Sequence, residues 1–343
     1  MFQLIQQQAA QILTVALMTI MLGLILRPIA HKMSLADMPN ARKNHQNVTP
    51  LIGGICIYLA CGLSSFVFGD MPGQDLRTLF VATSLFLLLG VLDDLFDLKA
   101  SVKLLSQVTI SYMFIASTGL HVTNFGVFFG LGNAFEFGFL SLPFTILAIV
   151  GLTNAFNMID GCDGLAASLV GLVILALLYL GSSQFEFLMQ IYLLMLVVSI
   201  FVFLLFNFSN NPALKIFLGD GGSLFLGFII SVSLVEFAKG NETYSPSMVL
   251  WFVAIPVYDF CAVVARRLLL RRKIMSADRS HIHHYLLSFG LSHFQTTMLV
   301  LFAAITLLCL GVFLDVNYPS LSLFAFVGLF TFYLSLRLLN RRN

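Results

Sequence analysis

Four residues with oxygen-bearing side chains recur at every third position of one short stretch, at Asn154, Asn157, Asp160 and Asp163. Positions three apart share a face of a helix, so a helical turn or a tight loop would gather these oxygens on one side. A glycine follows each of the two carboxylates and allows close backbone approaches that a side chain would block. Only 10% of the residues in the chain are charged. We therefore interpret residues 154–166 as part of a site where chemistry takes place.

Two further acidic clusters lie elsewhere in the chain. Asp93 and Asp94 are adjacent after a run of leucines, and two carboxylates about 4 Å apart repel each other by roughly 1 kcal/mol in water and more at a protein surface. We interpret the pair as held for a cation or a proton, with a solvated helix end as the alternative. Lys103 could neutralise the pair or hold a phosphate, or only snorkel. Asp220, in FLGDGGS, has the close backbone that suits a metal ligand.

Three histidines, His281, His283 and His284, follow Arg279 in a long basic loop. They suggest either a zinc site or an anion-binding rim, but zinc usually needs four ligands in a closed geometry and no cysteine or second histidine pair is placed to complete one. The carboxylates and amides of the other clusters suit Mg²⁺, which prefers oxygen and completes its shell with substrate phosphates. We therefore assign the histidines to anion contact, with an interfacial amphipathic helix as the alternative.

The elements that must position these residues are membrane spans. The chain of 343 residues is 59% hydrophobic and holds 35 phenylalanines, which predicts an all-α polytopic membrane protein with a single transmembrane domain over residues 1–343. The first apolar stretch is interpreted as a retained span, since no cleavage pattern follows it. The five cysteines show neither metal-ligand spacing nor a disulfide framework. Eleven spans are predicted, near 9–28, 51–69, 78–92, 103–120, 138–153, 165–181, 187–206, 221–238, 247–265, 295–314 and 319–336. A surface hairpin is expected near 120–138.

The basic residues set the predicted topology. Sixteen of the 18 Lys and Arg fall in the loops after the odd-numbered spans and in the C-terminal tail, and only Arg77 and Lys239 fall on the other side. The positive-inside rule then places the C-terminus in the cytoplasm and, with eleven spans, the N-terminus outside. The polar clusters all emerge on the cytoplasmic face, so we expect one active site built from five loops, at 37–50, 93–103, 154–166, 207–223 and 266–294. Asp259, inside the ninth span, is a functional candidate whose partner the sequence does not reveal.

Oxygen ligands for magnesium beside Lys, Arg and His side chains are typical of phosphoryl transfer. The sequence has no Walker loop and no kinase signature. A site at the ends of membrane helices implies one lipid substrate and one substrate from the cytoplasm. A transporter is the main alternative from another class, but transporters place coupling acids near the bilayer midplane and often contain inverted repeats, whereas here the acids cluster at one face and no repeat is evident. A structural scaffold is a weaker alternative, because it would not need amide and carboxylate side chains at every third position of residues 154–163.

The motifs DDLFDLKASVK, NAFNMIDGCDGLA, FLGDGGS and SADRSHIHH occur in this order. The chain thereby resembles the polyprenyl-phosphate N-acetylhexosamine-1-phosphate transferases over roughly residues 37–294, and its histidine loop looks like that of the bacterial undecaprenyl-phosphate N-acetylglucosamine-1-phosphate transferases. The resemblance implies an enzyme of the bacterial inner membrane that uses UDP-GlcNAc and undecaprenyl phosphate and releases UMP. It would catalyse the first membrane step of a cell-surface polysaccharide, such as O-antigen or common antigen. Another UDP-sugar donor and a homo-oligomer remain open, and no nucleic acid partner is expected.

The resemblance also implies roles for individual residues. Asp220 would coordinate Mg²⁺ (or Mn²⁺), with Asn157 as a second ligand, and Asp93 and Asp94 would lie near the acceptor phosphate or the metal. Lys103 would bind phosphate. The donor would be contacted by Asp163 at the uridine, Phe217 at the uracil, and Arg279, His281, His283 and His284 at the pyrophosphate and sugar. Asp160 is left between metal ligand and loop support, and Asn154 is expected to cap the turn. Attack by the lipid phosphate in one displacement is expected, with Asp93 or Asp94 as base or nucleophile in the rival mechanism.

Overall fold

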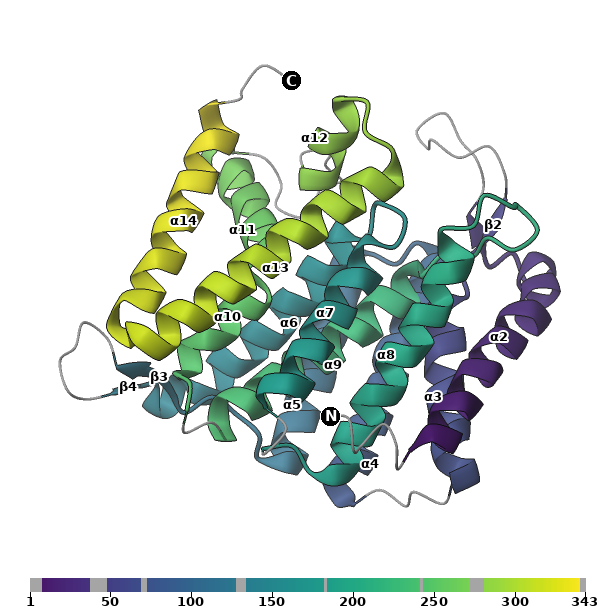
Figure 1. Ribbon diagram of the computed structural model, residues 1–343, viewed down its shortest axis with the longest axis horizontal. Helices are drawn as coiled ribbons and strands as arrows, with labels where there is room; N and C mark the ends of the chain where they lie inside the picture. The colour runs from purple at the N-terminus through teal and green to yellow at the C-terminus, as the bar shows by residue number, and fades with distance from the viewer. Residues whose placement is uncertain are drawn as a thin grey trace.

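The computed structural model describes residues 8–37, 48–68, 73–127, 134–181, 184–240, 243–271 and 281–339. Its long helices form a bundle (Figure 1): α2 (Ala9–Lys32), α3 (Gly53–Phe68), α4 (Gln74–Phe96), α5 (Ala100–Thr118), α6 (Ser141–Ile159), α7 (Leu165–Leu180), α8 (Phe187–Asn207), α9 (Gly219–Gly240), α11 (Ala254–Leu269), α13 (His293–Asn317) and α14 (Pro319–Leu339). Short helices are η1 (Gly138–Leu140), η2 (Pro246–Met248), α10 (Val249–Phe252) and α12 (Ile282–Ser288). The strands β1 (Ala36–Asp37) and β2 (Thr49–Pro50) pair antiparallel, as do β3 (Asn124–Val127) and β4 (Ala134–Glu136).

Seven of the described helices are long and apolar enough to cross a bilayer, namely α2, α4, α6 (with η1), α8, α9, α13 and α14. The η2–α10 segment and α11 would add an eighth if this pair, bent by 83°, is one span, and α3 and α7 are apolar but shorter. α5 occupies the predicted span 103–120 without meeting the same test. The helical membrane-protein class is therefore confirmed. The count of eleven spans and the orientation stay predictions.

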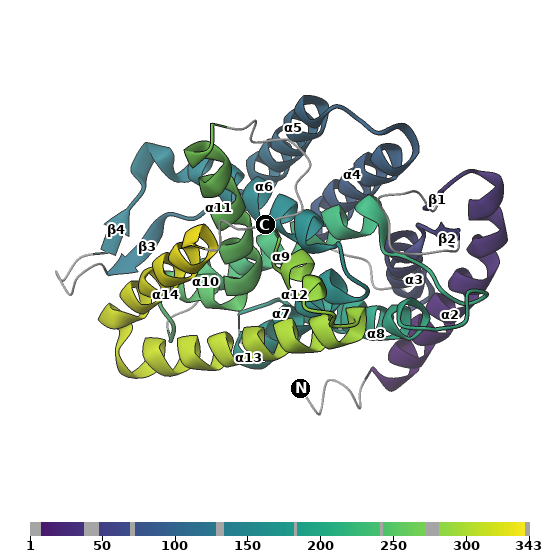
Figure 2. The same cartoon turned by 90° about the horizontal axis from the view of Figure 1, so that it is seen from above.

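The β3–β4 pair confirms the hairpin expected near 120–138, although residues 128–133 lie outside the described part of the chain. In Figure 1 this hairpin lies low in the view, whereas α12 and the β1–β2 pair lie at the opposite end of the bundle. Figure 2, a view from above, shows α12 over the middle of the bundle. The two ends therefore differ in what they carry.

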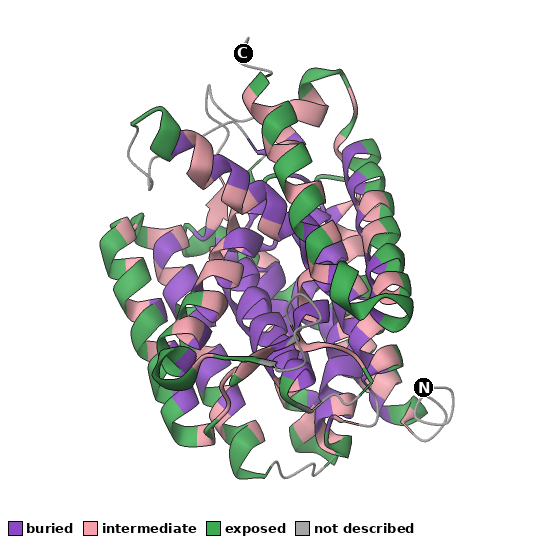
Figure 3. Cartoon of the chain, turned by 90° about the vertical axis from the view of Figure 1, so that its left-hand side faces the viewer, coloured by how far each residue is buried: buried purple, intermediate pink, exposed green. Residues whose placement is uncertain are grey.

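α9 is the central helix of the bundle. Almost all of its apolar stretch is buried, whereas α2, α13 and α14 expose much of theirs, and Figure 3 shows the buried residues in the middle and the exposed ones on the outer helices. Exposed apolar side chains on outer helices suit a bilayer and would be costly in water. The sequence lets neighbouring helices approach α9 closely, because small residues face each other there. A Cβ placed on Gly54 of α3 would lie 2.1 Å from Cα of Gly222, and one on Gly90 of α4 would lie 2.3 Å from the carbonyl oxygen of Asp220. These contacts fix the start of α9, which carries Asp220.

Candidate active site

Segments from all five predicted loops line one cavity of about 760 Å³. The charged, polar and aromatic residues of its wall are Asp37, Asp93, Asp94, Asp97, Asp160, Cys162, Asp163, Phe203, Asn207, Lys215, Phe217, Asp220, His284 and His293. The ends of α4, α6 and α8 and the start of α9 supply most of them. Residues separated by up to 256 positions in the chain, Asp37 and His293, thus share a wall.

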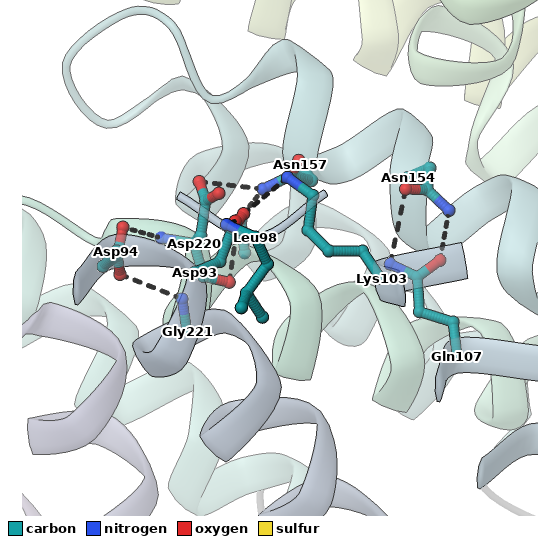
Figure 4. Close-up of polar contacts among 10 residues, drawn as sticks. Asp93, Asp94, Leu98, Lys103, Gln107, Asn154, Asn157, Asp220 and Gly221 are labelled. Atoms are coloured by element: carbon teal, nitrogen blue, oxygen red, sulfur yellow. Dashed lines mark hydrogen bonds and ion pairs between the residues drawn. The ribbon is translucent and has the colours of Figure 1, made fainter. Parts of the chain in front are cut away.

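Asp94 stands at the last turn of α4 and caps α9 (Figure 4). Its Oδ1 accepts a hydrogen bond from the backbone N–H of Asp220 at 3.1 Å, and its Oδ2 accepts one from the N–H of Gly221 at 3.3 Å. The first N–H groups of a helix have no partner inside the helix, and a carboxylate there also interacts favourably with the helix dipole. Asp94 therefore holds the backbone of Asp220 from a neighbouring helix.

Asp93, only 6% exposed, is engaged on both carboxylate oxygens. Its Oδ2 lies 2.5 Å from Nζ of Lys103, and its Oδ1 accepts from the N–H of Leu98 at 2.9 Å. The carboxyl groups of Asp93 and Asp220 also lie close enough to interact. Two carboxylates in contact need a proton or a cation between them, because like charges at this distance disfavour ionisation of both. Lys103 forms an ion pair with Asp93, which agrees with one of the three interpretations that the sequence left open for it.

Asn157 holds Asp220 from behind. Its amide nitrogen donates to Oδ1 of Asp220 at 3.1 Å and to Oγ of Ser223 at 2.9 Å, and Asn157 is not part of the cavity wall. The structure thus places it as a support of Asp220, and its role as a metal ligand stays a prediction. The sequence predicted that Asn154 caps the turn, and this prediction is wrong, because α6 continues to Ile159. Its amide instead donates to Oε1 of Gln107 on α5 at 2.6 Å.

Asp160 follows the last residue of α6 and lines the cavity. Burial raises the pKa of its carboxyl well above the ordinary value, and the charges of Asp220, Asp94 and Asp163 raise it further. Acidic side chains are therefore crowded in this part of the cavity, and their mutual repulsion would be relieved by a bound cation. The donors present, carboxylate oxygens beside an amide, are those that Mg²⁺ prefers.

No group of three or more His, Cys, Asp and Glu side chains forms a metal cage among the residues that the structure describes. Magnesium seldom needs one, because it is usually bound through one or two carboxylates and completes its shell with waters and substrate phosphates. The Asp93–Asp220 contact is the place where these residues fit such an ion.

Asp163 forms a second charged group in the wall of the same cavity. Its Oδ2 lies 2.6 Å from Nζ of Lys215, and its Oδ1 lies 3.9 Å from Nδ1 of His293. Oγ1 of Thr297 donates to its carbonyl oxygen at 2.7 Å. Nζ of Lys215 also lies 5.6 Å from the centre of the Phe217 ring, within the range of a cation–π contact. A lysine over an aromatic ring provides an anion-binding group beside a flat apolar face.

Sequence reasoning missed three of these residues. Lys215 was counted only as a topology signal, although it stands two positions before Phe217 in the same polar loop. Asn207 is the last residue of α8 and directly follows its apolar run, and a polar residue at the end of a span is a functional candidate. Its amide donates to the carbonyl oxygen of Ile216 at 2.9 Å, while its buried Oδ1 has no partner among the described residues. His293 carried no signal in the sequence, because a lone histidine at a helix start is common.

The histidines of the last loop divide by position, and Arg279 lies outside the described residues. Only His284 lines the cavity. His281 is 5% exposed and its Nδ1 lies 2.7 Å from Oδ2 of Asp259. His283 is 1% exposed, and burial followed by the charges of its histidine neighbours lowers the pKa of its imidazole to about 3. The structure gives His281 and His283 supporting positions behind the cavity wall, and their contacts with the donor stay a prediction.

His283 packs against the loop that carries Asp160. A Cβ on Gly161 would lie 2.2 Å from Nε2 of His283, so glycine is needed for this close approach. The two ring nitrogens of His283 have no hydrogen-bond partner among the described residues. The histidine loop and the 154–166 stretch therefore meet directly.

Comparison with known proteins identifies the family. Residues 76–238 match the model of glycosyl transferase family 4. A probable undecaprenyl-phosphate N-acetylglucosaminyl 1-phosphate transferase of Bacillus subtilis (strain 168) is 38% identical over 279 residues, which are 80% of this chain and 76% of the relative. The chain belongs to the polyprenyl-phosphate N-acetylhexosamine-1-phosphate transferases. The resemblance stated from the motifs is confirmed.

Two further relatives of this transferase are undecaprenyl-phosphate alpha-N-acetylglucosaminyl 1-phosphate transferases. That of Yersinia pestis is 31% identical over 297 residues (84% of this chain, 79% of the relative). That of Escherichia coli (strain K12) is 29% identical over 317 residues (90% and 84%). The protein is thus a glycosyl-1-phosphate transferase, and the transporter alternative is set aside. The region that matches the family model contains Asp93, Asp94, Asp160, Asp163 and Asp220.

Proposed function

We propose that the enzyme transfers GlcNAc-1-phosphate from UDP-GlcNAc to undecaprenyl phosphate, giving undecaprenyl-pyrophosphoryl-GlcNAc and UMP. The observation that carries the proposal is the cavity at one end of a bundle of membrane helices, whose wall contains the neighbouring acids Asp93 and Asp220 together with Lys215, Phe217 and Asp163. The names of the relatives supply the lipid and the sugar. The cavity supplies groups suited to two phosphate-bearing substrates.

Asp220 and Asp93, with Asp160 close by, are the residues that would hold Mg²⁺. A bound Mg²⁺ would neutralise charge on the donor pyrophosphate and stabilise UMP as a leaving group. Lys215 and Phe217 form the donor side, where the ammonium contacts phosphate and the ring receives the uracil. Lys103 lies beside Asp93 on the acceptor side, where its ammonium compensates the charge of the lipid phosphate. Mn²⁺ would serve as an alternative ion.

The transfer is a single displacement. A phosphate monoester is largely dianionic at pH 7, because its second pKa is near 6, so an oxygen of the lipid phosphate attacks without a base. It forms a bond to the phosphorus that bears the sugar, and the bond from that phosphorus to the oxygen of UMP breaks. The hydrogen bonds of the two acids support this mechanism over nucleophilic catalysis: Asp93 is engaged on both oxygens by Lys103 and a backbone N–H, and Asp94 by two N–H groups of α9.

The cavity faces the cytoplasm in this proposal, in the inner membrane of a bacterium. Lys103, Lys215 and Arg337 all lie at the cavity end of the bundle, which the positive-inside rule assigns to the cytoplasm. Eleven crossings would result if α3, α5 and α7 span together with the seven long helices and the bent pair, and the N-terminus would then lie outside. The product is the first lipid-linked sugar of a cell-surface polysaccharide, such as O-antigen or common antigen.

The test uses the purified full-length protein in detergent with UDP-GlcNAc and undecaprenyl phosphate. UMP release should require the lipid, stop with EDTA and return with Mg²⁺. Asp220→Asn should abolish release, whereas Asp315→Asn, which alters a buried carboxylate bonded to Ser245 far from the cavity, should retain it. UDP-GalNAc and UDP-MurNAc-pentapeptide should be poorer donors.

Two results would contradict the proposal. Absence of UMP release with every UDP-sugar would refute the reaction. A covalent phosphoenzyme formed with donor alone, without lipid, would refute the single displacement.

A further inference from the structure

Asp259 was a functional candidate without a partner in the sequence, and the structure shows four partners. It lies in α11, is 3% exposed, and its Oδ2 lies 2.7 Å from Nδ1 of His281. Its Oδ1 accepts from the N–H of Ile282 at 2.8 Å and from the hydroxyl of Tyr333 at 3.2 Å, and Nη2 of Arg337 lies 3.8 Å away. A buried carboxylate is costly unless it is paired and hydrogen-bonded, so both oxygens of Asp259 constrain the groups around them.

These partners hold the short helix α12. His281 and Ile282 form its start, and α12 has only seven residues, too few for a helix to be stable on its own. Its position must therefore come from contacts outside it. The last two turns of α14 add to them, because the guanidinium of Arg337 lies 5.7 Å from the centre of the Tyr285 ring and 5.8 Å from that of Tyr333.

The same short helix forms part of the cavity wall. His284 and Leu287 line the cavity, while Asp259, Tyr333 and Arg337 are not part of its wall. About one turn of α12 thus separates His281 and Ile282, which Asp259 holds, from His284 and Leu287, which line the cavity. A shift at the first end of such a short helix must move the other.

We propose that Asp259, together with Tyr333 and Arg337 of α14, is a set of positioning residues that fixes α12 so that His284 meets the sugar-nucleotide donor. The part that concerns the donor rests on the proposed function. The part that concerns the position of α12 does not, because it follows from the contacts of Asp259 alone. The C-terminal helix, which carries no motif of the family, thereby acts on the donor side of the site.

The first experiment measures kinetics with each substrate varied in turn. Asp259→Asn should raise KM for the donor about tenfold while kcat stays within about threefold and KM for the lipid stays within about twofold. Tyr333→Phe should raise the donor KM by about threefold, since it removes one hydrogen bond to a charged group. Tyr258→Phe is the matched control: its hydroxyl also joins α11 to α14, through the carbonyl oxygen of Phe326 at 2.6 Å, but does not contact Asp259. It should leave both KM values within about 1.5-fold of wild type.

The second experiment needs no turnover. Hydrogen exchange by mass spectrometry should show faster exchange in residues 281–289 of Asp259→Asn and Tyr333→Phe, with unchanged exchange in α9, and no such change in Tyr258→Phe. If Asp259→Asn does not yield folded protein, the two tyrosine variants decide the matter. An unchanged donor KM in Tyr333→Phe, or equal effects of the two tyrosine variants, would overturn the proposal.

The two experiments also separate this inference from the proposed function. One outcome is that the variants exchange faster in residues 281–289 but the wild-type protein releases no UMP from UDP-GlcNAc. This outcome would refute the donor assignment and leave the anchoring of α12 intact. Activity of wild type with no loosening in the variants would refute the anchoring alone.

Discussion

Replacing Gly54 by alanine should damage catalysis without touching the cavity. Gly54 of α3 faces Gly222 of α9, and a Cβ there would lie 2.1 Å from Cα of Gly222 and 2.4 Å from its N. Both neighbours are backbone atoms, so neither can rotate away. Ordinary contact begins at 3.4 Å, so α3 and α9 must separate by about 1.3 Å. Asp220 stands two residues before Gly222 and would move with α9.

The expected size follows from two terms. Overpacking costs about 1–3 kcal/mol, and alanine in a helix regains about 1 kcal/mol over glycine, so stability should fall by about 0–2 kcal/mol. A displacement of about 1 Å at a reacting group can cost roughly a hundredfold in rate, so kcat/KM should fall by about that factor. Activity should therefore suffer far more than stability.

The assay is UMP release under saturating and limiting donor, alongside a thermal melt in detergent. Gly62→Ala provides the control, because Gly62 lies on the same helix and a Cβ there meets no described atom within 4 Å. It should retain full activity and melt at the same temperature or higher. Wild-type kcat/KM in Gly54→Ala would refute the view that close packing of α9 positions Asp220.

Two further predictions concern single side chains. Lys215→Met should raise KM for the donor about tenfold or more, because it removes a charged contact to phosphate, whereas Lys239→Met, exposed at the other end of α9, should have no effect; equal KM values in the two variants would contradict the donor role of Lys215. His283 should make the fold less stable as pH falls, because the imidazole stays neutral in the fold, with a pKa of about 3, while the unfolded chain takes up a proton below the usual 6.5. The free energy of unfolding should fall between pH 6.5 and 3 by up to about 1.4 kcal/mol per pH unit. The thermal unfolding midpoint should therefore depend less on pH in His283→Gln than in the wild type, whereas His31→Gln should keep the wild-type pH dependence. An unchanged slope in His283→Gln would show that the protonation lies elsewhere.

The helices themselves could be predicted from the sequence, because a bilayer demands long apolar runs. Each of the eleven predicted spans coincides with a helix or, at 247–265, with the η2–α10 and α11 pair. The 83° bend was missed, although Pro256 gave a signal, since a proline inside an apolar run often marks a break and is tolerated in the first turn of a helix. The central position of α9 could not be predicted from the sequence, because an apolar run looks the same whether lipid or protein surrounds it.

The gathering of the site was predictable, but the partners inside it were not. The order of the predicted spans and the distribution of Lys and Arg predicted that the five loops lie on one face. Residues from all five loops line the cavity. Hydrogen bonds depend on sub-ångström geometry that spacing does not encode, so the cap formed by Asp94 and the support given by Asn157 could not be foreseen. The same holds for Asp259, whose partners Tyr333 and Arg337 lie more than 70 positions away.

The acids of the site also differ in how many of their carboxylate oxygens already accept hydrogen bonds or ion pairs. Asp94 is committed to α9, and Asp93 to Lys103 and Leu98. Neither can act as a nucleophile without giving up a contact that shapes the site. Asp220 is different, because its backbone is capped and Asn157 holds only one of its oxygens, Oδ1. A carboxyl group that is fixed in place beside Asp93 and open to the cavity is suited to holding a cation, because a bound cation would offset the repulsion between two neighbouring carboxylates. Of the two acids that would hold the proposed metal ion, Asp220 in the FLGDGGS motif is thus the one with more freedom to bind it, and Asp93 stands beside it, held by Lys103 and Leu98.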